Sequence, residues 1–248
     1  MAMYDALAPV YAALNGDVCY ERMADFVQKT LSARFAGEVK DVLDLGCGSG
    51  NMTFPLLARG YSMIGVDASV AMLSEAQMHP RASEVLWLSQ DMRSFELYGT
   101  VEAAVCTLDG INHLLSRRDV LSCFRLVHNY LVPDGIFIFD VNSPNKFAKT
   151  YGSRTYILED DGVFCAWQND YDPVRGGCRF DIDLFLEDGD GRYFRESFTI
   201  KEQRYTERQM LALLKDAGFE LLSITDDYTD DVPTEQTERL TFVAKAIK

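Results

Sequence analysis

The sequence has few of the residue patterns that build metal centres or disulfide frameworks. Its 248 residues include six cysteines and three histidines, and none of them form a Cys-x-x-Cys, His-x-His or His-x-x-x-His pattern. Zinc sites and disulfide-rich domains repeat these residues at regular, short spacings, so we expect neither a bound metal nor disulfide bonds. Reduced, mostly buried thiols are typical of cytoplasmic proteins, and we predict that location.

Long apolar runs and an excess of positive charge are also missing. No run of about 18 apolar residues occurs, so we predict no transmembrane helix and no membrane partner. The first residues, MAMYDALAPVYAALNGD, lack a basic leader followed by an apolar stretch, and we expect no targeting segment. The formal net charge of −14 argues against nucleic-acid binding, which requires a basic surface.

Apolar runs of strand length alternate with helical patterns over residues 1–148. A helix is expected before residue 36, because apolar side chains recur at helical spacing from Met23 to Phe35 and Asp17 can cap the segment. Expected strands occupy residues 42–46, 62–69, 84–92, 101–110 and 136–143, and expected helices follow residue 51 and span 70–78 and 117–131. This alternation predicts right-handed βαβ units and a parallel sheet.

The pattern changes after Tyr151. The stretch RFDIDLFL (179–186) alternates apolar and polar residues, and turn signals rich in glycine and aspartate separate runs of this type. These features predict an antiparallel meander over residues 151–200. A turn at Pro133-Asp134-Gly135 is expected just before the fifth strand.

The α/β pattern resumes over residues 201–248. Thr206 and Gln209 fit a capping box and Gly218 fits the end of the same helix, and two further strands follow. We therefore predict an α/β fold with a Rossmann-like, doubly wound, mostly parallel sheet of seven strands. Residues 1–148 and 201–248 would form that domain, with the meander inserted after the fifth strand.

The stretch DVLDLGCGSGN (41–51) places a glycine loop between a strand and a helix, where backbone amides can meet a ligand. Gly46 and Gly48 match the dinucleotide pattern GxGxxG, but its third glycine is replaced by Asn51. A pyrophosphate about 4 Å from the Asp44 carboxylate would cost a few kcal/mol. A zwitterionic amino acid fits better, with its ammonium at Asp44 and its carboxylate at the loop amides.

Two more acids end the next two expected strands. Asp67 can accept both hydroxyls of a ribose, and Asp91 can accept an exocyclic amine while Met92 faces an adenine ring. An alternative is that both acids only cap the segments that follow them. The ligand that joins an α-amino acid, a ribose and an adenine without phosphate is S-adenosylmethionine.

Four motifs in order, VLDLGCGSG, GVDAS, QDMR and CTLDGINHL, resemble the class I S-adenosylmethionine-dependent methyltransferases. The layout is similar to bacterial small-molecule enzymes such as the amino-sugar N-methyltransferases, and the resemblance covers about residues 1–148 and 201–248. It implies that the methionine part lies on Asp44, Gly46 and Gly48, with Cys47 as a small filler. It implies further cofactor contacts from Asp67, Ala68, Met72, Asp91, Met92 and Leu108.

Methyl transfer from a sulfonium requires alignment of the acceptor and exclusion of water, and no metal. A neutral amine or hydroxyl must still lose a proton, and Asp109, Asn112 and His113 are the candidates after the fourth strand. His113 is a candidate base, or packs and only shapes the pocket. Asn112 orients the acceptor, or is a turn residue.

The N-terminal aromatic residues Tyr4, Tyr11 and Tyr20 are candidates for a lid over the cofactor, with Tyr20 favoured, although ordinary packing explains them equally well. The meander would cover the acceptor site or mediate a homodimer. The sequence thus predicts methylation of N or O in a small molecule.

The alternatives are an RNA or protein methyltransferase, a non-catalytic S-adenosylmethionine-binding protein, and a dinucleotide oxidoreductase. A basic groove built from Lys146, Lys149 and Arg154 would favour the RNA enzyme.

Overall fold

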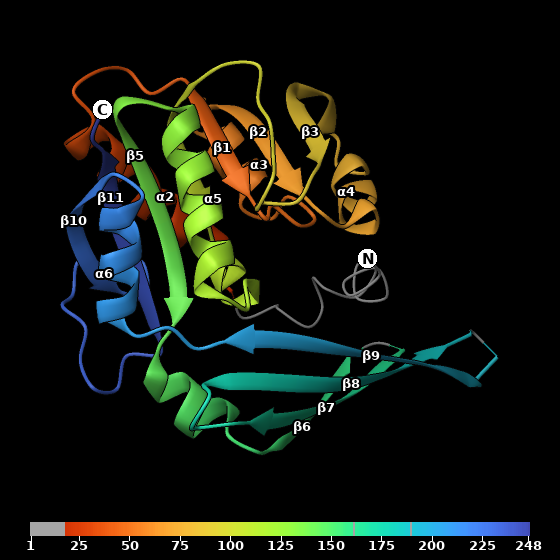
Figure 1. Ribbon diagram of the computed structural model, residues 1–248. Coiled ribbons are helices and arrows are strands. Elements are labelled where there is room, and N and C mark those ends of the chain that lie inside the picture. The colour runs from red at the N-terminus through yellow and green to blue at the C-terminus, as the bar shows by residue number, and fades with distance from the viewer. Residues whose placement is uncertain (1–17, 161, 189) are drawn as a thin grey trace.

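A computed structural model describes residues 18–160, 162–188 and 190–248, which form two sheets with helices around the larger one (Figure 1). The larger sheet has seven strands in the order β10-β11-β5-β4-β1-β2-β3. Its strands are β1 (Asp41–Leu45), β2 (Ser62–Asp67), β3 (Val85–Ser89), β4 (Val101–Cys106), β5 (Leu131–Asn142), β10 (Phe219–Asp226) and β11 (Arg239–Ala246). Only β11 runs against its neighbours, so the predicted mostly parallel sheet is confirmed.

The helices of the described chain lie between the strands as the sequence pattern predicts. They are α2 (Tyr20–Arg34), α3 (Thr53–Ala58), α4 (Val70–Gln77), α5 (Arg117–Tyr130) and α6 (Glu207–Asp216), with the short turns η2 (Ala82–Glu84), η3 (Gly110–His113) and η4 (Lys146–Tyr151). The capping box of Thr206 and Gln209 is present at the start of α6. Within the described residues, no helix combines the length and the apolar character needed to cross a membrane.

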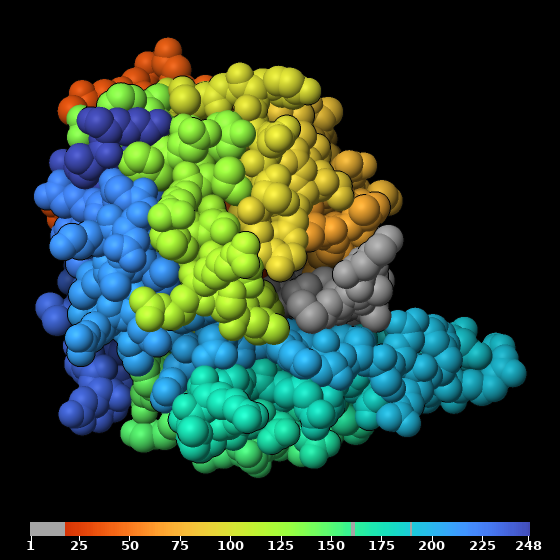
Figure 2. All heavy atoms as spheres, viewed as in Figure 1, coloured from red at the N-terminus to blue at the C-terminus, as the bar shows by residue number. Residues whose placement is uncertain are grey.

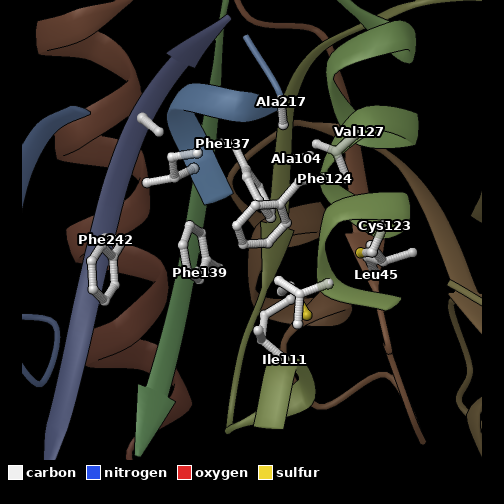
Figure 3. Close-up of a cluster of buried hydrophobic side chains, with 14 of the residues drawn as sticks. Leu45, Ala104, Ile111, Cys123, Phe124, Val127, Phe137, Phe139, Ala217 and Phe242 are labelled. Carbon is white, nitrogen blue, oxygen red and sulfur yellow. The ribbon is translucent and has the colours of Figure 1, made fainter. Parts of the chain in front are cut away.

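Both faces of the large sheet are buried. Successive side chains of a strand point to opposite faces, so β5 sends Phe137 and Phe139 into one apolar layer and Ile136 and Ile138 into the other. The first layer lies under α5 and α6 and includes Phe139 stacked on Phe242 at 5.0 Å between ring centroids (Figure 3). The second layer lies under α2 and α3. This burial explains why the strands read as almost continuous apolar runs.

One local expectation is wrong, and another concerns a residue outside the described chain. Pro133-Asp134-Gly135 lies inside β5 rather than before it, because a bulge at Asp134 (φ 62°) shifts the register with β4 and lets the strand continue. Helix α2 has Cys19 at its N-cap position, without a side-chain capping bond. Asp17, Tyr4 and Tyr11 lie outside the described residues.

The second sheet is the expected antiparallel meander, with strands β6 (Thr155–Asp160), β7 (Val163–Tyr171), β8 (Gly177–Glu187) and β9 (Tyr193–Gln203). β9 continues to Gln203, beyond the expected boundary at residue 200. The predicted alternation in β8 is present, and its buried side chains pack with Phe147 of η4 and Met72 of α4. The β8–β9 hairpin projects beyond the body of the protein (Figures 1 and 2).

Candidate active site

A cavity of about 740 Å³ opens at the carboxyl ends of β1, β2 and β4. Strand ends of a parallel sheet meet at one edge, which is where α/β proteins place their ligand sites. The residues predicted from the sequence that line the cavity are Tyr20, Gly46, Cys47, Gly48, Asp67, Ala68, Met72, Asp91, Met92, Leu108 and His113. Asp44, Asp109 and Asn112 were also predicted and are not among its lining residues.

The glycine loop keeps a conformation that other residues rarely adopt. Gly46, Gly48 and Gly50 have φ values of 74°, 53° and 82°, in the left-handed region. The Gly48 amide donates to Asp67 Oδ2 at 2.8 Å, which ties the loop to the end of β2. Burial, with the nearby acids, raises the pKa of Cys47 well above its usual value, so this thiol is not a thiolate nucleophile.

Asp44 is buried at the end of β1, with 1% of its surface exposed. Its Oδ2 accepts from Thr53 Oγ1 at 2.6 Å, whereas Oδ1 has no hydrogen-bond partner among the described residues. Burial, with a smaller contribution from the charge of Asp67, raises the pKa of this carboxyl to about 7, although the hydrogen bond from Thr53 opposes the shift. A buried carboxyl oxygen without a donor fits a ligand ammonium, which would restore its ionised form.

Asp67 holds two main-chain groups in place. Its Oδ1 accepts from the Ser69 amide at 2.8 Å and its Oδ2 from Gly48, and the side chain of Ser69 caps α4. Burial raises the pKa of Asp67, although these bonds oppose the shift. Each carboxylate oxygen can accept a second hydrogen bond, so both remain available to the hydroxyls of a ribose.

Asp91 is paired with Arg93, a cavity residue that sequence reasoning missed. Arg93 Nε lies 2.9 Å from Asp91 Oδ1 and its Nη2 lies 2.5 Å from Oδ2, and the Arg93 amide also donates to Oδ1. Arg93 holds the pKa of Asp91 below its usual value although partial burial opposes this. Asp91 therefore both organises the segment after it, as the capping alternative supposed, and faces the cavity.

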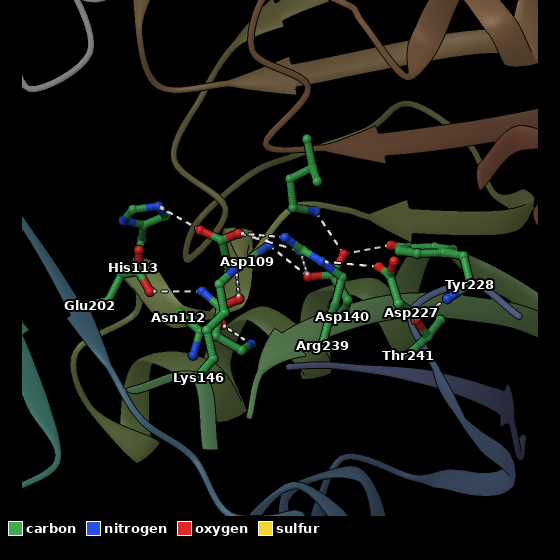
Figure 4. Close-up of polar contacts among 12 residues, drawn as sticks. Asp109, Asn112, His113, Asp140, Lys146, Glu202, Asp227, Tyr228, Arg239 and Thr241 are labelled. Atoms are coloured by element: carbon green, nitrogen blue, oxygen red, sulfur yellow. Dashed lines mark hydrogen bonds and ion pairs between the residues drawn. The ribbon is translucent and has the colours of Figure 1, made fainter. Parts of the chain in front are cut away.

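The turn after β4 is strained and is held by a buried acid. Leu108 and Asp109 have φ values of 53° and 56°, which non-glycine residues adopt rarely. Asp140, fully buried at the end of β5, accepts both of their amides at 2.7 Å (Figure 4). It also accepts from Tyr228 Oη and Arg239 Nη1, each at 2.6 Å.

Asp140, Tyr228 and Arg239 were not predicted from the sequence. Asp140 stands in IFIFDVNS, at the carboxyl end of an expected strand, so the strand-end argument that selected Asp44 and Asp67 could have found it. Arg239 begins the last strand and carries no comparable local signal.

His113 and Asp109 lie next to each other at the edge of the cavity. His113 Nε2 is 4.0 Å from Asp109 Oδ2, and Asp109 Oδ1 is 3.3 Å from Arg239 Nη1. Burial lowers the pKa of His113, although Asp109 and the Lys201 backbone oppose this shift. Burial alone would raise the pKa of Asp109, but Arg239 and Lys146 hold it below its usual value. A neutral imidazole beside a carboxylate can take a proton from a bound ligand.

Asn112 does not line the cavity, and its place in η3 favours the turn-residue alternative over orientation of an acceptor. It is fully buried, its Nδ2 donates to the Gln203 carbonyl at 2.9 Å, and its Oδ1 accepts from the Asn142 amide at 2.9 Å. These bonds join η3 to β9 and β5. The side chain is therefore engaged with main-chain groups.

Tyr20 stands at the start of α2 and faces the cavity. Its hydroxyl accepts from Asn51 Nδ2 of the glycine loop at 3.4 Å, and burial raises the pKa of the phenol. The neutral ring closes one side of the cavity.

Comparisons with known proteins agree with this geometry. The family described as "Methyltransferase domain" matches residues 42–135. The Bacillus subtilis protein named "Putative methyltransferase YqeM" is 32% identical over 99% of this chain and 98% of its own. A crystal structure of an S-adenosylmethionine-dependent methyltransferase from Clostridium acetobutylicum is 29% identical, covers 99% of both chains and superposes with a TM-score of 0.89.

The sugar N-methyltransferase KedS8 from Streptoalloteichus shares the fold, with 20% identity, a TM-score of 0.79, and coverage of 97% of this chain and 92% of its own. The chain therefore belongs to the class I S-adenosylmethionine-dependent methyltransferases.

Proposed function

We propose that the protein methylates a nitrogen or oxygen of a small molecule, with an amine as the favoured acceptor. The observation that carries this proposal is the His113–Asp109 pair at the cavity edge, where burial keeps the imidazole neutral beside a carboxylate. A neutral histidine accepts a proton at physiological pH, which an amine must lose before it can act as a nucleophile.

The charges of the cavity favour a cationic guest. Among the described residues, the ionisable lining groups besides His113, Cys47 and Tyr20 are Asp67, Asp91, Asp119 and Arg93, so acids outnumber bases there. A groove for RNA would need Lys146, Lys149 and Arg154 free on one surface, but the partly buried Lys146 donates from Nζ to Asn142 Oδ1 at 3.0 Å. These charges support a small amine over a polyanion.

When bound, S-adenosylmethionine supplies an electrophilic methyl group on a sulfonium. Asp44 would hold the ammonium, the amides of the glycine loop the carboxylate, and Asp67 the ribose, while Ala68, Met72, Met92 and Leu108 flank the adenine. These contacts fix the cofactor, so that Tyr20 and the inserted sheet can exclude water from the acceptor. His113 takes the acceptor proton, and Asp109 stabilises the imidazolium that forms.

The inserted sheet would form a wall of the acceptor site. Its last strand contacts η3 through the Lys201 backbone at His113 and the Gln203 carbonyl at Asn112. Dimerisation through the insertion is the alternative role, and light scattering of the purified protein would detect it.

The test is turnover of S-adenosylmethionine with a panel of amino sugars, simple amines and matched alcohols, in the wild type and His113→Gln. Amino sugars come first because KedS8 carries that activity in its name. We expect methylated amines only, a loss of kcat in the variant, and an unchanged dissociation constant for S-adenosylmethionine. Equal turnover by the variant would refute the role of His113.

A further inference from the structure

Glu202 lies beside the proposed base and comes from the inserted sheet. It is the second-last residue of β9 and only 5% exposed. One ligand-type atom each of Asp109, His113 and Glu202 lies within 4.8 Å of the other two (Figure 4). Glu202 Oε2 accepts a hydrogen bond from Asn142 Nδ2 at 3.0 Å. The neighbours of the base thus include a second, poorly solvated carboxyl group.

The charges around Glu202 do not balance if every group is ionised. The buried cluster holds three carboxyl groups, of Asp109, Asp140 and Glu202, and two cations, Arg239 and Lys146. Asp227 also pairs with Arg239, but it is partly exposed and its charge is balanced by Arg22. Asp140 accepts four hydrogen bonds, one of them from Arg239, and Asp109 also faces Arg239, so the oxygens of both groups already meet donors and a cation. Glu202 accepts from a neutral amide, so it is the group that can hold a proton at the lowest cost.

We propose that Glu202 keeps a proton in the resting enzyme and releases it when an acceptor binds as a primary or secondary ammonium ion against His113 and Asp109. The Glu202 O–H bond breaks and the proton passes to solvent, while the ammonium brings the positive charge that replaces it. The net charge of the buried cluster is zero before and after binding. This inference rests on the proposed function, since it names how that site admits a cation.

The ionised Glu202 then assists the next step. His113 takes one N–H proton from the ammonium and leaves a neutral amine, and the resulting imidazolium lies near two carboxylates, of Asp109 and Glu202. Glu202 acts through His113 and the bound amine, so it is a positioning residue. A hydroxyl acceptor brings no charge and could not displace the proton.

The surroundings of Glu202 agree with this role. Burial and the charge of Asp109 raise the pKa of Glu202 well above its usual value, while Asn142, Lys146 and Arg239 oppose the shift. The other titratable groups near it in the described chain include Tyr151 and Cys178. Tyr151 accepts from Asn142 Nδ2 at 2.9 Å, Cys178 lies opposite Glu202 in the β8–β9 pairing, and burial raises the pKa of both side chains. The groups counted come from η3, η4, β5, β8 and β11.

The test uses Glu202→Gln in the full chain with S-adenosylhomocysteine bound. Glutamine keeps an oxygen for the Asn142 bond but holds no proton that titrates in this range, and Glu196→Gln, an exposed site on the same strand, is the matched control. The probe is methylammonium chloride, added at constant ionic strength from pH 6 to pH 8. The readout is the imidazole signal of His113 in protein labelled with ¹³C-histidine, assigned with His113→Gln.

In the wild type and Glu196→Gln, methylammonium should shift the His113 signal. Its affinity should rise up to tenfold for each unit of increasing pH, because Glu202 releases a proton on binding and a higher pH favours that release. Sodium and tetramethylammonium should have no effect. In Glu202→Gln, binding should weaken at least tenfold and lose most of its pH dependence. The inference is overturned if methylammonium binding has the same pH dependence in Glu202→Gln as in the wild type, or if up to 100 mM methylammonium does not shift the His113 signal. It is also overturned if Mn²⁺ alone broadens that signal, which would indicate a metal site.

The experiments distinguish an error in the role of Glu202 from an error in the proposed function. If S-adenosylhomocysteine binds and the amine panel is methylated while Glu202→Gln behaves as the wild type, only the role of Glu202 is wrong. If no amine or alcohol is methylated by a protein that binds the cofactor, the proposed function itself fails.

Discussion

Replacement of Asp44 by asparagine should weaken the binding of S-adenosylmethionine while it increases the stability of the ligand-free protein. The carboxyl is buried at the end of β1, and its pKa is raised from 3.8 to about 7. A folded-state pKa above the unfolded one means that the protonated group adds stability, which is complete below about pH 4 and is lost as the pH rises to 7. At about 1.4 kcal/mol per pKa unit, the ionised carboxylate costs roughly 4 kcal/mol above pH 7.

The side-chain amide introduced by Asp44→Asn would keep an oxygen for the Thr53 hydroxyl and carry no charge. Without its ligand, the variant should therefore be more stable than the wild type by up to about 4 kcal/mol at pH 8, and the difference should vanish near pH 4. Urea unfolding at both pH values measures this. The same variant should bind S-adenosylmethionine more weakly by about 2–5 kcal/mol, or roughly 30-fold to several thousand-fold, because the ammonium loses its buried partner.

Calorimetry with two ligands provides the control. 5′-Methylthioadenosine has the adenine and ribose but lacks the amino acid, so its dissociation constant should be the same in the wild type and Asp44→Asn. The reasoning fails if S-adenosylmethionine binds the variant as tightly as the wild type. It also fails if the variant loses affinity equally for both ligands, since the substitution would then have disturbed the whole glycine loop.

Three further outcomes are expected. The affinity of the wild type for S-adenosylmethionine should fall about tenfold per unit below pH 7, as Asp44 becomes protonated, and calorimetry in two buffers should detect the proton released on binding. Once an acceptor is known, His113→Gln should lower kcat by about 10²–10⁴-fold, and raising the pH should not restore kcat. Asp140→Asn should destabilise the fold by about 3–5 kcal/mol, because Arg239 loses its 2.6 Å partner. The control Asp216→Asn, at an exposed site, should change the unfolding free energy by less than about 0.5 kcal/mol.

Parts of the site that depend on one segment were predictable. The loop glycines, Asp67 and Leu108 lie within or directly after apolar runs, and the carboxyl ends of parallel strands meet at one edge whatever the packing above them. The cavity lining confirms that placement. Local periodicity also predicted the alternation of β8 and the capping box of α6.

Contacts between distant segments were not predictable in this way. Arg239 and Asp140 are 99 residues apart, and Glu202 and Asn142 are 60 apart, so their pairing depends on the register of β11 and the exact end of β9. The burial of Asn112 between β5 and β9 has the same origin. A pattern of apolar residues reports which face of a strand is buried, but it does not report which polar side chain will lie opposite.

The amino-acid sequence by itself determined the order of strands and helices, the glycine loop and the row of acids at the sheet edge, because these follow from short-range periodicity and backbone sterics. Only the tertiary structure decided which acids are ionised. Burial left Asp44 with an oxygen that has no partner in the described part of the chain, Arg239 stabilised the carboxylate of Asp109, and the inserted sheet brought Glu202 to His113. The protonation of each group depends on neighbours from distant parts of the chain, and packing alone brings those neighbours together.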